Sequence, residues 1–299
     1  MRALLNRRTF SKSLIAGFAA GSPLLLPAQG RARNLKIGHT GITWGRAGIE
    51  QAIQDIAGLG YHGFETFGNV LESWEEQGGL GRILEKNNLQ LISGYCGCNL
   101  IDPAVRKEEI AKMIGWGKLI KKYGGNVSVI GPNSVKREEY DFSAHKANIV
   151  TSLNETAKAL TDMGLVAVLH QHTGTCVETR EETYSVMEAV DTRYVKFGPD
   201  VGQLAKGGAD PVQVVKDFLP LVHHMHLKDF NGGEHFIGYC PLGQGKVDLA
   251  AILDLMEGTR PEGRIMVELD SGRNMPMTPL ETAQISKAYL EKLGYSFRP

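Results

Sequence analysis

The chain has 299 residues, of which 42% are hydrophobic and 22% are charged. This length and hydrophobicity suit one large domain or two small ones with a substantial core, which excludes extensive disorder outside the termini. Its 33 Lys and Arg balance 33 Asp and Glu, so we expect no nucleic-acid partner and a small substrate that is not strongly anionic.

Residues 1–30 have the pattern of an export signal. The basic pair Arg7-Arg8 precedes SLIAGFAAGSPLLLPAQG, an apolar Gly- and Ala-rich stretch that ends in small residues. This order is typical of a twin-arginine signal, so we predict a periplasmic protein that is cleaved near Gly30. An uncleaved membrane anchor is the alternative, but the apolar run is short and interrupted by Pro23. No other stretch is apolar enough to cross a bilayer, so no stable membrane span is expected after signal removal.

After the signal, apolar runs of strand type alternate with amphipathic stretches of helix type. The strand candidates are residues 35–44, 63–67, 89–95, 126–131, 166–172, 195–200, 223–229 and 264–269. The clearest helical patterns cover residues 49–60, 103–125 and 143–164, and later helices are expected to begin at Asp210-Pro211 and Thr278-Pro279.

Eight strands and eight helices in strict alternation predict one closed parallel barrel. We therefore expect a single (β/α)8 TIM barrel over residues 31–299, with its active site at the carboxyl ends of the strands. A doubly wound open sheet is the alternative, but no Gly-x-Gly-x-x-Gly follows the first strand. The four cysteines are expected to be buried thiols, because Cys96 and Cys98 share a strand face and are too close for ordinary bridging.

Histidine and carboxylate residues follow the last four predicted strands, where each apolar run ends. They are His170 and His172, Asp200, His226 and Glu268. Because alternate residues of a strand point to one face, neighbouring parallel strands bring these groups together. Nitrogen and carboxylate groups around one point predict a divalent-metal site. Taken alone, Asp200 would be assigned to a turn and His226 to the core, so the prediction depends on their joint occurrence.

Four segments resemble motifs of the xylose-isomerase-like barrel superfamily, which contains sugar isomerases, ketose 3-epimerases, inosose dehydratases and endonuclease IV. They are GYHGFETFG, PDVGQLAKGGADP, HMHLKD followed by PLGQGKVDLAAIL, and IMVELD, in the family's order and spacing. The resemblance covers essentially the whole mature chain. The run HQHTGT is most similar to the inosose dehydratase branch.

By position, the resemblance implies His170, Asp200, His226 and Glu268 as the four metal ligands. Two residues depart from the usual pattern, because the epimerases and isomerases have Glu where this chain has His170, and the family's strand-six His is replaced by Gln203. Two carboxylates with imidazoles and no thiolate favour Mn²⁺, with Co²⁺, Fe²⁺ or Zn²⁺ possible.

The resemblance implies chemistry on a keto-sugar or keto-polyol, through α-proton abstraction and a metal-bound enediolate. Loss of a β-substituent gives dehydratase or lyase activity, our first hypothesis; return of the proton to carbon gives an isomerase or ketose 3-epimerase. A non-catalytic periplasmic carbohydrate-binding barrel is the second alternative, favoured by the two departures. Endonuclease IV activity is disfavoured by the neutral charge balance and by export. The oligomeric state stays open.

Candidate residues for proton transfer and substrate binding come from the same strand ends. We expect catalysis by His172, Glu268 and Lys228. His172 is alternatively an outer hydrogen-bond partner or a fifth ligand, and Lys228 a partner of Asp229. Glu65 is expected to bind substrate hydroxyls, or alternatively to cap the following helix. The complete set of predicted substrate-binding residues is His39, Trp44, Glu65, Gln203 and Arg273.

Overall fold

Eight parallel strands form the centre of the computed structural model, which describes residues 33–261, 263–270 and 275–299. The strands are β1 (Ile37–Thr40), β2 (Phe64–Phe67), β3 (Leu91–Cys98), β4 (Val127–Pro132), β5 (Val166–Leu169), β6 (Val195–Phe197), β7 (Met225–Leu227) and β10 (Ile265–Val267). Each overlaps one of the eight predicted runs. The predicted export signal at residues 1–30 and Arg273 lie outside the described residues.

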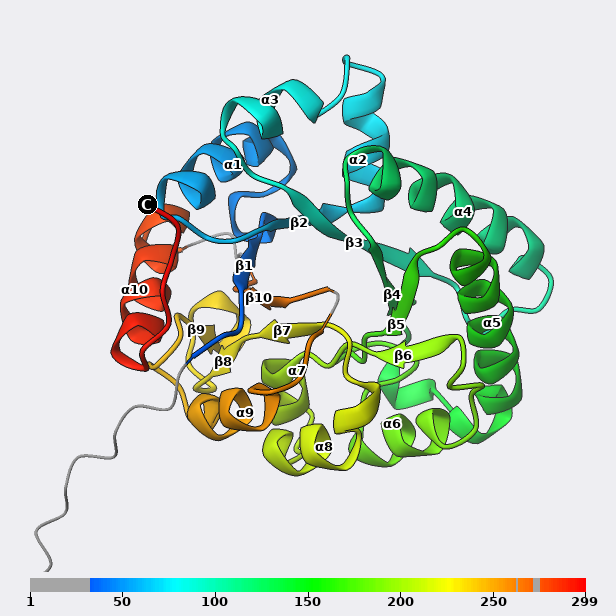
Figure 1. The fold of residues 1–299 in the computed structure, drawn as a ribbon. Coiled ribbons are helices and arrows are strands. Elements are labelled where there is room, and N and C mark those ends of the chain that lie inside the picture. Colours follow the sequence, from blue (N-terminus) through cyan, green and yellow to red (C-terminus); the bar gives the residue numbers. More distant parts are fainter. Residues whose placement is uncertain (1–32, 262, 271–274) are drawn as a thin grey trace, which may run out of the picture. The chain divides into compact units, whose positions relative to one another are not determined.

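The strands close into a barrel. Their order is β6-β5-β4-β3-β2-β1-β10-β7, and every pairing is parallel. The ends of this sheet are joined by parallel bridges from Phe197 to Val222 and from Asp200 to His226. Figure 1 looks along the barrel, with the strands in the middle and the helices around them. The predicted (β/α)8 barrel is confirmed.

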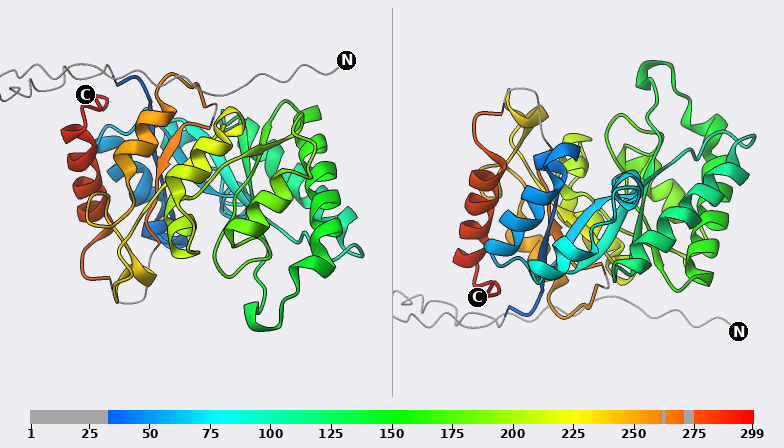
Figure 2. Two further views of the ribbon diagram at one scale, coloured as in Figure 1. Left: turned by 90° about the horizontal axis from the view of Figure 1, so that it is seen from below. Right: turned by 90° about the horizontal axis from the view of Figure 1, so that it is seen from above.

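Ten α-helices in the described residues surround the strands, and the side views show them lying along the barrel (Figure 2). They are α1 (Ile49–Gly58), α2 (Gly68–Glu75), α3 (Gly81–Lys86), α4 (Arg106–Lys122), α5 (Phe142–Asp162), α6 (Arg180–Met187), α7 (Val201–Lys206), α8 (Pro211–Asp217), α9 (Leu249–Met256) and α10 (Pro279–Lys292). The prediction of one helix for each strand is wrong in two units, because α2 with α3 and α7 with α8 divide their connections. A glycine pair separates the two helices each time, and Gly78, Gly79 and Gly208 have the positive φ angles that glycine adopts readily.

Two helix starts were predicted from Pro and a capping residue, and both are confirmed. At α8 the Asp210 carboxylate accepts hydrogen bonds from two backbone N–H groups, and Pro211 is the first helical residue. At α10 the Thr278 hydroxyl and the Glu281 carboxylate form a reciprocal capping box, with Pro279 between them. Such caps satisfy N–H groups that have no partner within the helix.

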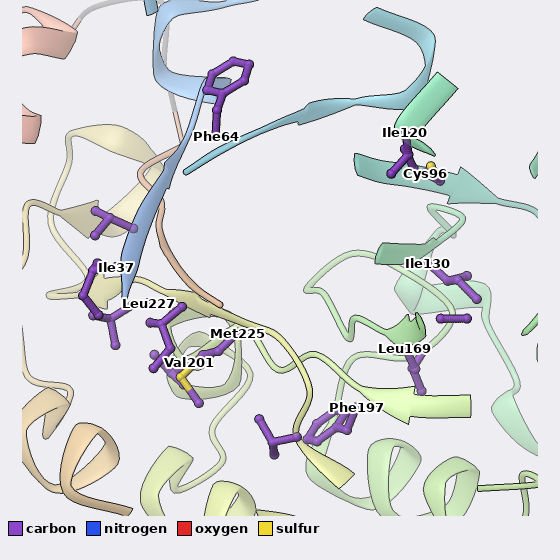
Figure 3. Packing of buried hydrophobic residues seen from close by; sticks show 14 of the residues in the cluster. Ile37, Phe64, Cys96, Ile120, Ile130, Leu169, Phe197, Val201, Met225 and Leu227 are labelled. Carbon is purple, nitrogen blue, oxygen red and sulfur yellow. The ribbon is translucent and has the colours of Figure 1, made fainter. Parts of the chain in front are cut away.

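Strand alternation separates two layers of buried side chains. Leu169, Phe197 and Met225 belong to the large core between strands and helices, part of which Figure 3 shows. The alternate residues Val127 and Val129 form a separate small apolar cluster with Val168. Because the period is two residues, the side chains that continue this inner set at the carboxyl ends of the strands point into the barrel.

A short hairpin follows β7 and was not predicted. Its strands are β8 (Asp229–Phe230) and β9 (Tyr239–Cys240), paired antiparallel. The Asp229 carboxylate anchors the returning chain by accepting hydrogen bonds from the N–H groups of Gly243 (2.9 Å) and Gly245 (2.8 Å). A Cβ atom on Gly245 would lie 2.0 Å from this carboxylate, so the close approach requires glycine. The Asp of the HLKD segment and the Gly residues of the PLGQG segment therefore act together to hold this loop.

Two smaller predictions also concern the described residues. All four cysteines are buried and free, which confirms their assignment as buried thiols. Over the part of the chain that the structure describes, no helix is both long enough and apolar enough to span a bilayer.

Candidate active site

The inner face of the barrel carries the predicted site residues at one end. His224, His226 and Lys228 alternate along and beyond β7 with the outer-core residues Met225 and Leu227. Two strands away around the barrel, β5 ends at Leu169, so His170 continues the inward row that Val168 begins. Period-two alternation, which motivated the prediction, therefore brings these groups together.

Three of the four predicted metal ligands have donor atoms that fit one cation. His170, Asp200 and His226 each offer an atom within 4.8 Å of the others, and all three side chains are fully buried. His170 Nε2 has no hydrogen-bond partner within the described structure, whereas Asp200 Oδ2 lies 2.7 Å from the Lys228 ammonium. Buried polar atoms are normally satisfied, so the unpaired His170 nitrogen beside two further donor groups favours a bound ion. The fourth predicted ligand, Glu268, lies beside them with Oε2 3.1 Å from His226 Nδ1.

The two imidazoles differ in the state of the ring nitrogen that would face a metal. His170 Nδ1 lies 3.1 Å from the Gly198 carbonyl, to which it donates as the neutral tautomer, so Nε2 carries the lone pair. Burial and the neighbouring His226 and His172 lower the pKa of His170 well below its usual value, which keeps the ring neutral. His226 Nε2 lies 2.6 Å from Glu65 Oε1 and donates to it, and Nδ1 lies 3.1 Å from Glu268 Oε2. Burial alone would lower the pKa of His226, but Glu268 and Glu65 raise it well above its usual value, so a metal ion at Nδ1 would take the place of a proton.

Glu65 is the hub of a buried hydrogen-bond network. Its carboxylate accepts from His226 Nε2 (2.6 Å) and from the Ser93 hydroxyl (2.5 Å), and it lies 3.1 Å from His224 Nε2. Burial alone would raise the pKa of Glu65, but His226 and His224 hold it below its usual range, so it is ionised. A carboxylate behind a metal-ligating histidine fixes the ring and raises its basicity. The alternative of a helix cap does not hold, because no side chain caps α2.

Lys228 joins the carboxylates of the site. Its fully buried ammonium lies 2.7 Å from Asp200 Oδ2, 2.7 Å from Glu268 Oε1 and 3.0 Å from Asp270 Oδ2. Burial alone would lower the pKa of Lys228, but these three carboxylates raise it well above its usual value. Burial would raise the pKa of Glu268, but His226 and Lys228 hold it well below its usual range. The alternative partner Asp229 instead binds backbone N–H groups.

The charges of the site are unbalanced in favour of a cation. Four buried or nearly buried carboxylates, those of Glu65, Asp200, Glu268 and Asp270, face a single buried lysine. Buried charge is normally paired, so the excess of carboxylate accommodates a divalent ion together with a protonated imidazole. The donor set therefore fits the predicted cofactor class.

His172 and Gln203 meet at the rim of the site. The Gln203 amide donates to His172 Nε2 at 2.8 Å, while His172 Nδ1 lies 2.7 Å from the Thr173 carbonyl. These contacts describe a neutral ring whose Nε2 is an acceptor. Gln203 is itself oriented by the Thr173 hydroxyl, which donates to its Oε1 at 2.6 Å. Sequence reasoning placed both residues at the site, and the structure brings them into direct contact.

An inner cavity of about 90 Å³ lies among these groups. Four predicted residues line it, namely Glu65, His170, His172 and Glu268. Sequence reasoning missed its other lining residues, which are Thr40, Ile42, Thr66, Phe67, Tyr95 and Asp270. The position of Asp270, two residues after Glu268, was the one available signal for any of them.

Two predicted substrate-binding residues, His39 and Trp44, do not line this cavity. His39 is buried, with Nδ1 2.7 Å from the Thr40 carbonyl, and its ring contacts those of Trp44 and Tyr61 edge to face. Trp44 donates from Nε1 to Asp55 at 2.8 Å. Their contacts in the structure are thus with the protein core and α1.

The fold and this site define the family of the protein. A family model of the xylose isomerase-like TIM barrel matches residues 53–293, so the chain belongs to that family. It is 26% identical over 270 residues to the inosose dehydratase of Clostridium botulinum (strain Alaska E43 / Type E3), which covers 82% of this chain and 89% of the relative. The resemblance to the superfamily and its inosose dehydratase branch is therefore confirmed.

Solved structures share the fold at lower identity. The probable 3-DHS dehydratase AsbF of Bacillus anthracis superimposes with a TM-score of 0.70 at 17% identity, covering 87% of this chain and 99% of AsbF. The IolI protein with a bound zinc atom gives a TM-score of 0.71 at 18% identity, covering 87% of this chain and 98% of IolI. At these identities the likeness concerns the fold.

Proposed function

We propose that this member of the xylose isomerase-like family is a dehydratase or lyase that acts on a keto-sugar or keto-polyol. The observation that carries the proposal is the imidazole of His172, whose Nε2 is an acceptor, in a cavity that is also lined by the carboxylates of Glu65 and Glu268 and by His170 with its unpaired Nε2. The inosose dehydratase relatives support the same reaction class. An isomerase or ketose 3-epimerase shares the first proton transfer and is the alternative outcome.

A divalent metal ion is the cofactor that we propose, held by His170, Asp200, His226 and Glu268. Bound there, it would polarise the substrate ketone and so acidify the neighbouring C–H bond. Mn²⁺ is our first choice because of the carboxylate content, with Co²⁺, Fe²⁺ and Zn²⁺ as alternatives; the zinc of the IolI structure supports a divalent ion in this fold. Metal analysis of the purified protein tests the identity.

The protein residues supply the proton transfers. His172 accepts the α-hydrogen at Nε2, the ring nitrogen that now accepts from Gln203, so the substrate takes the place of that amide hydrogen bond. Lys228 acts behind the substrate, where its ammonium holds the carboxylates of Glu268 and Asp270 in position. The α-C–H bond and the β-C–O bond break, a C=C bond forms, and the β-oxygen leaves with the proton that His172 took from the α-carbon.

Incubation of the metal-loaded protein with keto-sugars and inososes in D₂O tests the proposal. A dehydratase or lyase produces an enone or 1,2-diketone absorbance, and Glu268→Gln abolishes it. Deuterium at the α-carbon without that absorbance would instead identify an isomerase or epimerase. Absence of both signals with every keto-sugar would support a carbohydrate-binding barrel and overturn an enzymatic function.

We also propose that the protein is exported to the periplasm by the twin-arginine route. The Arg7-Arg8 pair and the short apolar run after it support the proposal. Replacing both arginines by lysine should retain the protein in the cytoplasm in cell fractionation. Unchanged export of that variant would contradict the proposed route.

A further inference from the structure

The end of the barrel opposite the candidate active site holds a cavity of about 720 Å³, which we call the amino-end cavity. His62, Gln90 and Arg264 line it, and these residues precede β2, β3 and β10 by one or two positions. The strands are parallel, so their amino ends meet on one side of the barrel. The candidate active site lies where the strands end, and the amino-end cavity is therefore a separate space.

Two arginine side chains in this cavity are held by backbone carbonyl groups. Arg264 donates from Nη1 to the carbonyl of His62 at 2.8 Å. Arg298 donates from Nε to the carbonyl of Tyr61 at 2.7 Å and from Nη1 to that of Asn88. Because Tyr61 and His62 are consecutive residues, the two guanidinium groups are fixed close together. Arg264 Nε and Nη2 and Arg298 Nη2 make no hydrogen bond with the described residues, so both groups keep donors for a ligand.

The positive charge at this cavity is not compensated. No carboxylate of the described residues is paired with either arginine; burial and the charge of Arg298 lower the pKa of Arg264, and burial lowers that of Arg298. Burial also lowers the pKa of His62, and the charges of Lys36, Arg264 and Arg298 lower it further. Three cations therefore lie around His62. The single carboxylate among the described lining residues, Glu85, is exposed.

The neighbouring surface adds to this excess of positive charge. Lys122 also lines the amino-end cavity, but it is paired with Glu75 at 2.6 Å. An adjoining cavity of about 330 Å³ shares Arg264 and adds Lys36 and Arg260, and no carboxylate occurs among the residues that the structure describes in its lining. This end of the barrel is thus locally basic, although the whole chain has no net charge.

Arg264 has a backbone conformation that favours glycine. Its φ is 59°, in the left-handed region, where glycine avoids the steric cost that other residues bear. Most of the described residues with such angles are glycines, but this position carries arginine. Unfavourable backbone geometry of this kind concentrates at functional sites. It supports a role for the guanidinium group beyond its one hydrogen bond to the fold.

We propose that the amino-end cavity is a binding site for a phosphate group, held between the guanidinium groups of Arg264 and Arg298. The planar, forked donors of arginine match the oxygens of a phosphate, and such charge-assisted hydrogen bonds are strong. A phosphate dianion also offsets more of the local positive charge than a carboxylate does. The site is independent of the proposed dehydratase activity, because it lies at the other end of the barrel.

Calorimetric titration of the metal-loaded protein with inorganic phosphate at constant ionic strength tests this assignment. Arg264→Gly should weaken phosphate binding about tenfold or more, because it removes charged donors. Glycine suits the left-handed backbone, so this variant should remain folded. Arg298→Met should give a similar loss, and Arg298→Lys, which keeps the charge but not the fork, should restore part of the affinity. A parallel titration with glycerol 3-phosphate distinguishes the sources of the group, because a site for a phosphate ester should bind it more tightly than the free ion.

Two control variants separate a specific site from general electrostatics. Asn88→Gly changes another left-handed residue of the same cavity (φ 47°), but it removes no charge and keeps the carbonyl that holds Arg298. Arg193→Gln removes one positive charge from an exposed ion pair with Asp191. Both variants should bind phosphate as the parent protein does. An equal loss in Arg193→Gln, unchanged affinity in both Arg264→Gly and Arg298→Met, or no binding to the parent protein would overturn the proposed site.

Discussion

The interior of the barrel has two sides of opposite character. On β4 and β5, Val127, Val129 and Val168 pack into a small apolar cluster. Across the barrel, β7 carries His226, and Lys228 and Glu268 follow directly after β7 and β10; all three side chains are buried as well. The same period-two alternation turns both groups of side chains into the barrel, so the difference lies in the residues and not in the backbone.

The contrast indicates what each side is for. An apolar interior stabilises the barrel through burial, whereas buried ion networks often contribute little net stability because desolvation offsets their attraction. A chain selected for stability alone would continue the valines around the barrel. The charged side is therefore best explained by chemistry, and substitutions on the two sides should separate stability from activity.

Lys228→Met should have the largest effect on stability. It leaves the carboxylates of Asp200, Glu268 and Asp270 buried without their shared cation, which costs about 3–5 kcal/mol in the free energy of unfolding of the metal-free protein. Added Mn²⁺ should reduce the loss, because a divalent ion compensates the same carboxylates.

Urea denaturation with and without Mn²⁺ measures this effect. Lys158→Met is the control, since Lys158 makes an exposed ion pair with Asp162 on α5, and its loss should change the free energy of unfolding little. If Lys228→Met proved as harmless as that control, the carboxylates would not depend on the lysine.

Val127→Ala, on the apolar side, should lower the stability of the fold without changing the catalytic rate. Removing two methyl groups from a fully buried position costs roughly 2 kcal/mol, including the cavity left behind. The rate per folded molecule should stay the same, because the residue lies outside the lining of the inner cavity. A tenfold loss of activity in the folded variant would show that the apolar side also shapes the site.

Much of this contrast was accessible from the sequence, because alternation and the positions of strand ends determine which side chains face inward. His170, Asp200 and His226 were grouped on that basis, and their donor atoms do converge. The three-way pairing of Lys228 was not accessible, because two of its partners come from the chain after β10 and one from the start of α7. Period-two reasoning places a side chain on a face without identifying its partners.

Three further features of the structure could not be predicted from the sequence. Glycine pairs separate α2 from α3 and the unpredicted α7 from the predicted α8, and they were readable as breaks but do not say whether a helix lies on both sides. The hairpin after β7 depends on Asp229 meeting Gly243 and Gly245 across a loop, a contact between residues distant in sequence. Tyr95 and Phe67 reach the cavity from β3 and β2, and their aromatic character alone fits the core equally well.

His39 and His226 are both buried imidazoles, but His39 lacks the carboxylate partners of His226, so the two should differ in their response to pH. Burial lowers its pKa to about 4, whereas two carboxylates raise that of His226. The unfolded chain binds a proton at His39 near pH 6.5 and the folded protein only near pH 4, so stability falls as the pH decreases through this window. From pH 7 to pH 5 the loss from this residue is about 2 kcal/mol.

Denaturation curves of the parent protein and His39→Gln at both pH values isolate this contribution. The variant cannot take up the proton, so its stability should decrease less between pH 7 and pH 5. Identical pH dependence in the two proteins would mean that His39 is protonated in the fold, contrary to its buried aromatic surroundings.

Glu65→Gln should have the smallest effect on folding and act instead on the charged side alone. The amide keeps the size of the side chain and can still accept from His226 Nε2, but it no longer provides the negative charge that makes this imidazole a strong ligand. Metal affinity should fall about tenfold or more in competition with a fluorescent chelator.

Glu72→Gln is the control, because Glu72 accepts a hydrogen bond from Trp116 on the outside of the barrel. The metal affinity of this variant should equal that of the parent protein. Equal affinity in Glu65→Gln as well would show that the ion does not depend on His226, and the ligand set would have to be redrawn around His170, Asp200 and Glu268.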